Sequence, residues 1–210
     1  MFFFLWIGGN AAFWVGVLAA EISGYPLQTA PSVAVAMLLA FGQGLLLWRL
    51  QWGRSLLGGL VLGLVPAYLG FHLQSGHWVS EVLILGLVLS LASHNALLAQ
   101  KWRQELWQNA GSEELHHLVH PRQALLYTLV NILMIGGLLL IWYMPAAPLP
   151  ARKGVWLLAA VAVLNQEGIK RKWYATVKGI GALAIGATTF QVGLYLWLLL
   201  VLSLRLWGQG

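Results

Sequence analysis

One polar stretch, residues 93–122, holds most of the side chains in this chain that could do chemistry. It reads SHNALLAQKWRQELWQNAGSEELHHLVHPR and contains four of the six histidines, three of the six acidic residues and three of the twelve basic residues. Histidine and glutamate are common general acids, general bases and metal ligands in proteins. Any chemistry at the surface of this otherwise apolar chain is therefore predicted to occur in this stretch.

Three histidines of this stretch raise the question of a metal site. His116 and His120 stand four residues apart, on one face of a helix, where two imidazoles could share an ion, and His117 lies between them. The sequence offers no third ligand and no carboxylate at a useful spacing. A solvated loop that faces lipid headgroups is favoured, and no metal site is predicted.

His72 and His94 fall near opposite ends of predicted apolar helices. An imidazole inside a membrane helix can ligate the magnesium of a chlorophyll or the iron of a haem, so both are candidate pigment or haem ligands. A hydrogen bond between neighbouring helices is the favoured alternative, because a lone histidine carries little information.

A basic cluster lies further along the chain, in the sequence QEGIKRKWY at residues 166–174. Lys170, Arg171 and Lys172 stand beside a tryptophan and a tyrosine, a combination that could bind anionic lipid headgroups or a diphosphate. Ordinary determination of membrane topology explains the same cluster without a ligand, and this explanation is favoured.

The composition places the chain among membrane proteins. Hydrophobic residues make up 60% and charged residues 9% of the 210 positions, values far outside the soluble range. The net charge of +6 is therefore interpreted as a topology signal, and no nucleic acid partner is expected. The chain has no cysteine and no aspartate, so thiolate chemistry and disulfides are excluded and all six acidic residues are glutamates.

Apolar runs separated by turns predict one domain over residues 1–210, an all-α polytopic membrane helix bundle with about seven transmembrane helices. Gly59 and Gly63 have the small-xxx-small spacing that lets helices approach closely. A proline-rich turn is predicted at 145–153, and the short run after it gives the weakest span. The predicted spans are residues 1–20, 29–48, 55–73, 78–99, 123–144, 154–165 and 180–204.

The basic residues divide unequally between the two sides of this predicted bundle. The side that carries the N-terminus has nine of the twelve, and the positive-inside rule places that side in the cytoplasm. The N-terminus and a loop at about 101–122 are then cytoplasmic in a multi-pass integral membrane protein. The nine are Arg49, Arg54, Lys101, Arg103, Arg122, Lys170, Arg171, Lys172 and Lys178, against Arg152, Lys153 and Arg205 on the other side.

The order of these features resembles the UbiA superfamily of membrane prenyltransferases, of the 1,4-dihydroxy-2-naphthoate (MenA-like) type. The resemblance rests on Leu73-Gln74-Ser75-Gly76 before a span, His94-Asn95 at its end, and Arg122 to Tyr127 at the start of the next helix. It extends over residues 1–205 and matches the third to ninth helices of that family. It implies a truncated UbiA-like bundle without the first two helices.

This chain departs from the family in its carboxylates. Prenyl transfer ionises an allylic diphosphate, and clustered carboxylates must hold Mg²⁺ against its phosphate oxygens. The family's aspartate-rich motifs are missing, and only Glu105 stands near the corresponding place, beside Lys101 and Arg103. Glu105 is expected to be ion-paired, so no Mg²⁺ is expected. The resemblance then implies a vestigial polar site made of His94, Asn95, Lys101, Arg103, Glu105 and Arg122.

Two functions of different classes follow. The first is a non-catalytic accessory subunit, a pseudoenzyme whose bundle holds an isoprenoid lipid, quinone, carotenoid or chlorophyll and packs on other membrane protein subunits. The second is an active prenyltransferase that moves a prenyl group from an allylic diphosphate to an aromatic acceptor. The missing carboxylates favour the first.

Overall fold

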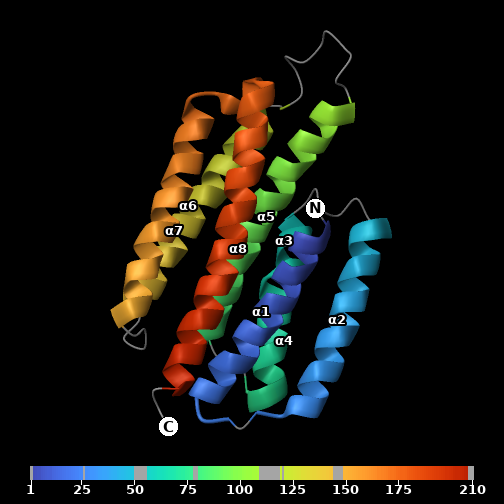
Figure 1. The fold of residues 1–210 in the computed structure, drawn as a ribbon, viewed down its shortest axis with the longest axis vertical. Coiled ribbons are helices and arrows are strands. Elements are labelled where there is room, and N and C mark those ends of the chain that lie inside the picture. The colour runs from blue at the N-terminus through green and yellow to red at the C-terminus, as the bar shows by residue number, and fades with distance from the viewer. Residues whose placement is uncertain are drawn as a thin grey trace.

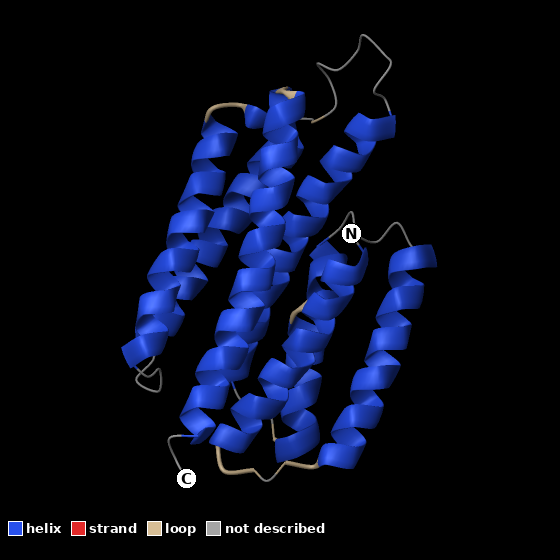
Figure 2. Ribbon diagram, viewed as in Figure 1, coloured by secondary structure: helices blue, strands red, loops and turns tan. Residues whose placement is uncertain are grey.

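The computed structural model describes residues 2–25, 27–49, 56–77, 80–108, 119, 121–143 and 149–207. These residues form α-helices joined by turns, with one short 3-10 helix and no strand in those ranges (Figure 2). The predicted all-α fold is confirmed. The elements are α1 (Phe2–Ile22), α2 (Thr29–Arg49), α3 (Leu56–Leu62), α4 (Leu64–Ser75), α5 (Ser80–Gln108), α6 (Pro121–Tyr143), α7 (Leu149–Lys170), η3 (Trp173–Ala175) and α8 (Val177–Trp207).

The helices lie side by side and alternate in direction, as apolar helices joined by short connections must (Figure 1). In Figure 1, α2, α5 and α7 run upward, and the other helices run downward. The long helix α8 contacts α1, α5 and α7, while α6 packs against α5 and α7. α2 stands at the edge of the bundle, where it contacts α1 and α4.

A helix break at Gly63 divides the third predicted span, residues 55–73, into α3 and α4. Pro66 has no N–H to donate to the carbonyl of Leu62, which is four residues earlier. The backbone of Gly63 leaves the helical region, with φ −121° and ψ −76°. α3 and α4 still cross the bundle as one broken segment, so the described chain has seven such segments and the predicted number is confirmed.

The two glycines of the third span lie against α5. A Cβ built on Gly63 would be 2.3 Å from the backbone nitrogen of Ser90, and one built on Gly59 would be 2.5 Å from the Ser90 carbonyl oxygen. Only residues without a side chain allow the two backbones to approach this closely. The predicted tight packing is confirmed, and both glycines face the interior of the bundle.

Two predicted boundaries need correction. α5 continues to Gln108, so the segment 101–108 of the predicted loop is helical. An ion pair between Lys101 and Glu105 along the helix, and the burial of Trp102 and Leu106, hold this extension in place. α7 spans 22 residues, so residues 149–153 of the predicted proline-rich turn are helical and the weakest span is a full-length helix.

The membrane character of the chain is supported by three of the helices. Within the described ranges, α5, α6 and α8 each contain a segment long and apolar enough to cross a bilayer. α6 buries Tyr127 and Met134 toward the bundle, yet its outward face carries Leu125, Leu129 and Leu133, each more than half exposed. A helix that is apolar all round needs hydrocarbon rather than water outside it. The chain is a helical membrane protein.

Candidate lipid-binding groove between α5 and α8

An open groove of about 520 Å³ runs between α5 and α8 on the outside of the bundle. Four of its residues on α8 stand on one helical face, because positions 185, 189, 192 and 196 follow the i, i+4, i+7, i+11 pattern. A helix rises about 1.5 Å per residue, so this stripe extends roughly 16 Å along the bundle. The lining residues are Gln100, Arg103, Ile185, Thr188, Thr189, Val192, Gly193 and Leu196.

The groove is polar toward one end and apolar toward the other. Gln100 of α5 donates from Nε2 to Thr188 Oγ1 of α8 at 2.9 Å, and this bond ties the two walls together. Arg103 lines the groove one turn above Gln100. Below this level the walls are formed by Val192 and Leu196. Such a groove fits an amphiphile better than a fully polar solute.

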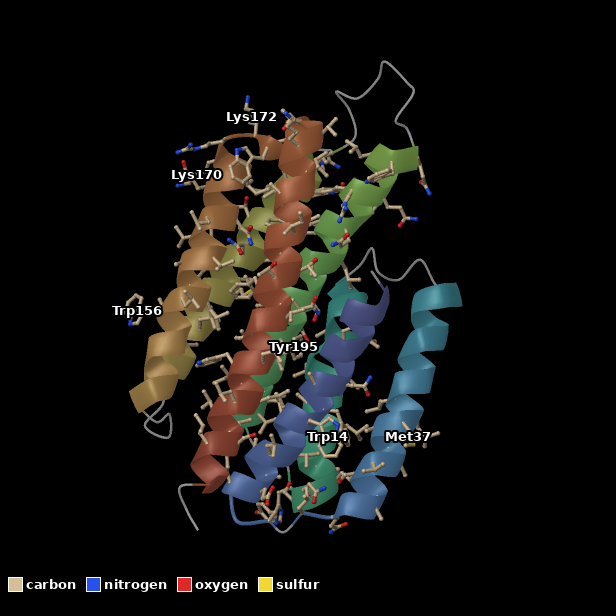
Figure 3. All side chains as sticks on the ribbon, in the orientation of Figure 1. Trp14, Met37, Trp156, Lys170, Lys172 and Tyr195 are labelled. Carbon is tan, nitrogen blue, oxygen red and sulfur yellow. The ribbon has the colours of Figure 1, made fainter. Side chains whose placement is uncertain are left out.

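Hydrogen bonds from α5 and α8 satisfy the backbone groups that the helix break releases. The hydroxyl of Tyr195 donates to the Leu62 carbonyl oxygen at 3.0 Å and lies 3.0 Å from Ser93 Oγ. Ser90 Oγ accepts the Leu64 N–H at 2.7 Å. Figure 3 shows Tyr195 near the middle of the bundle. These hydrogen bonds stabilise the helix break, because unpaired backbone groups inside a membrane bundle would cost several kcal/mol.

Tyr195→Phe is expected to lower the free energy of unfolding by about 1–2 kcal/mol, because it leaves the Leu62 carbonyl without its donor. Thermal unfolding in a mild detergent measures the loss. Tyr127→Phe is the matched control, since the buried hydroxyl of Tyr127 has no hydrogen-bond partner among the described residues. Equal losses in the two variants would contradict the role assigned to Tyr195.

The residues of the predicted vestigial polar site are spread over several surroundings. His94 and Asn95 are both 2% exposed, inside the bundle and outside the groove lining. Lys101 Nζ lies 3.5 Å from Glu105 Oε1, the ion pairing expected for this glutamate. Arg103 lines the groove. Arg122 is exposed in the first turn of α6. Among these residues Arg103 alone lines the groove.

The two candidate pigment or haem ligands are not brought together. The ring of His72 lies 3.4 Å from the His77 carbonyl oxygen at the end of α4, whereas the Cβ of His94 packs beside Gly59 in α3. The described ranges contain no cluster of three or more histidine or acidic side chains able to hold a metal ion. His116, His117, His120, Glu113 and Glu114 lie outside the described residues.

Gln74, from the turn that carries part of the UbiA resemblance, has a structural role here. Its Oε1 accepts the Gln28 N–H at 2.7 Å, and its Nε2 donates to Ser32 Oγ. These bonds fasten the end of α4 to the start of α2. The following Gly76 adopts a left-handed conformation with φ 68° and ends the helix.

The turn between α7 and α8 exposes the basic cluster. Lys170, Arg171 and Lys172 are exposed, and Arg171 Nε donates to Glu167 Oε1 at 3.0 Å, one turn back along α7. Figure 3 shows Lys170 and Lys172 at the upper end of the bundle, directed away from the helices. The three cations therefore lie together at the end of α7 and in the turn that follows it.

Three polar residues of the groove were not predicted as site residues. Gln100, Thr188 and Thr189 are single polar residues in apolar helices, and such residues usually mark contacts between helices. Their positions along α5 and α8 were visible in the sequence. Their pairing depends on the relative register of the two helices, which the sequence pattern does not contain.

Comparisons with protein-family models, with curated proteins and with solved structures gave no match to this chain. The resemblance to the UbiA superfamily therefore stays a prediction. The function proposed below rests on the groove and on the chemistry of its walls.

Proposed function

We propose that this chain is a non-catalytic membrane protein that holds an isoprenoid lipid, such as a quinone or the tail of a carotenoid or chlorophyll, in the α5–α8 groove. The observation that carries the proposal is the division of this groove into a polar end with Arg103, Gln100 and Thr188 and an apolar end with Val192 and Leu196. Its two ends suit the two ends of one amphiphile.

The polar end suits a headgroup that accepts hydrogen bonds. The guanidinium of Arg103 has five N–H donors and stays protonated at any physiological pH. It can therefore donate hydrogen bonds to a carbonyl oxygen of a quinone. Thr189 is exposed at the same level and can add a hydroxyl donor. Below it, Val192 and Leu196 can cover an isoprenoid tail with apolar surface.

We further propose an accessory role in a membrane complex. α2 stands at the edge of the bundle and exposes Met37 and Leu38, 68% and 70% accessible. α6 and α7 also expose apolar side chains, including Trp156. Other membrane protein subunits could pack on these faces, which bilayer lipid otherwise covers.

No prenyl transfer is expected when the purified protein receives Mg²⁺, an allylic diphosphate and a naphthoate or benzoate acceptor. Glu105 is held by Lys101, and a single paired carboxylate cannot hold Mg²⁺ against a diphosphate. Product formation is followed by chromatography with Glu105→Gln as the comparison. Turnover that is abolished by Glu105→Gln would instead support the active prenyltransferase.

The orientation proposed for the multi-pass bundle puts the N-terminus and the end of α5 in the cytoplasm. Nine of the twelve basic residues stand on that side. A reporter fused after Gly210 is expected to be exported, and one fused near Asn109 is expected to be retained. The reverse pattern of reporter activity would contradict this orientation.

Native mass spectrometry of the protein released from its own membrane in mild detergent tests the proposal. The expected spectrum contains the chain with one bound isoprenoid lipid, alone or within a larger assembly. A chain that is free of isoprenoid lipid in every mild detergent would remove the support for this function.

A further inference from the structure

The turn between α7 and α8 lies outside the groove lining. We propose that residues 167–178 form a fixed binding site for the headgroups of anionic phospholipids. The site joins exposed cations to an exposed indole ring at one end of the bundle. It does not depend on the function proposed for the groove.

The turn, residues 167–178, carries four cations and one carboxylate. Lys170, Lys172 and Lys178 are exposed, and no ion pair joins them to any residue in the described ranges. The one carboxylate of the turn, Glu167, is already bound by Arg171. The ammonium groups of Lys170, Lys172 and Lys178 therefore remain for lipid phosphate groups. Each cation attracts anionic lipid over a distance of about a Debye length.

The tryptophan of the turn is fixed against the bundle. The ring of Trp173 packs on Gly168, where a Cβ would lie 2.5 Å from the ring carbon Cε3. The side chain is still 37% exposed. An indole anchored in this way, beside lysines at the end of a membrane bundle, is suited to the headgroup region of a bilayer.

The backbone of the turn is ordered rather than extended. Lys172 adopts the left-handed conformation with φ 55°, which is uncommon for a residue with a side chain. Gly179 leaves room for the carbonyl of Trp173, and its N–H donates to Thr176 Oγ1 at 3.1 Å, which caps α8. Topology determination during membrane insertion requires only the positive charges. The ordered backbone therefore points to a role of the turn after the protein has inserted into the membrane.

The test measures lipid selectivity of the full-length protein in bilayers of phosphatidylcholine with and without phosphatidylglycerol. Lipids retained on release are counted by native mass spectrometry. Lys170→Gln/Lys172→Gln is expected to weaken phosphatidylglycerol association by about 5-fold per charge removed. Arg152→Gln/Lys153→Gln removes two charges near the other end of α7 and should leave this association unchanged.

A further variant separates the charge from the shape of the turn. Lys172→Gly removes one cation but favours the left-handed backbone, so the turn should keep its fold and lose only about 5-fold in association. The proposal is overturned if wild type does not prefer phosphatidylglycerol, or if the Lys170/Lys172 and Arg152/Lys153 variants lose equal amounts. Displacement of the lipid by inorganic phosphate, at matched ionic strength, would also overturn it, because the site would then bind free phosphate.

Discussion

Gly63→Leu should prevent the bundle from reaching its folded state. A Cβ at this position would lie 2.3 Å from the Ser90 nitrogen and 2.6 Å from the carbonyl carbon of Leu89, both backbone atoms that no rotamer change can move. Overpacking of this kind costs about 3 kcal/mol, and relief would require α3 and α5 to separate. Size-exclusion chromatography and thermal unfolding in mild detergent are expected to show aggregated or strongly destabilised protein.

Gly136→Leu is the matched control for this variant. Gly136 lies in α6, another membrane-length helix, and a Cβ there would meet nothing within 4 Å. The control should insert and remain as stable as wild type. Normal folding of Gly63→Leu would contradict the close contact between α3 and α5.

Val192→Trp should empty the α5–α8 groove of its proposed lipid. Val192 is half-buried in the groove wall, and an indole at this position would occupy the space proposed for the tail. The amount of isoprenoid lipid retained after purification is expected to fall at least ~10-fold, which corresponds to about 1.4 kcal/mol of binding free energy.

Leu200→Trp separates this effect from a general effect of a new indole. Leu200 lies further along α8, is 58% exposed and does not line the groove. This variant should keep the lipid content of wild type. Equal retention by both variants would mean that the lipid binds elsewhere.

The number and order of the helical segments could be predicted because each apolar run carries its own signal. Turns with glycine or proline, such as Gly24 and Gly76, separate these runs, and both glycines have positive φ in the structure. The helix break at Gly63 was missed although Pro66 stands three residues later. Hydropathy is insensitive to such a break, since both halves of the segment are apolar.

The end of α5 was misjudged for a related reason. Residues 101–108 are polar in sequence, which predicts a loop beyond the membrane, but a helix needs only one buried stripe to continue. Trp102 belongs to that stripe. Its ring centroid lies 5.5 Å from the ring centroid of Tyr127 in α6, and its Nε1 donates to Gln123 Oε1 at 3.0 Å. These partners are about twenty residues away in the chain, so a local pattern cannot reveal them.

The candidate site was harder to predict than the fold. The expected ion pairing of Glu105 was correct because Lys101 lies four residues before it on the same helix. The groove depends instead on the register between α5 and α8, which brings Gln100 to Thr188 across 88 residues of chain. The sequence identified Arg103 as a polar-site residue but did not indicate the surface to which it contributes.

Photocrosslinking with an isoprenoid quinone that carries a diazirine in its tail is the most direct test of the proposed groove. Adducts in wild-type protein are expected on the α8 peptide that contains Ile185, Val192 and Leu196, and they should be lost in Val192→Trp but kept in Leu200→Trp. A lipid site between α5 and α8 would be contradicted by labelling that Val192→Trp does not change and that is spread evenly over outward faces, such as residues 129–140 of α6.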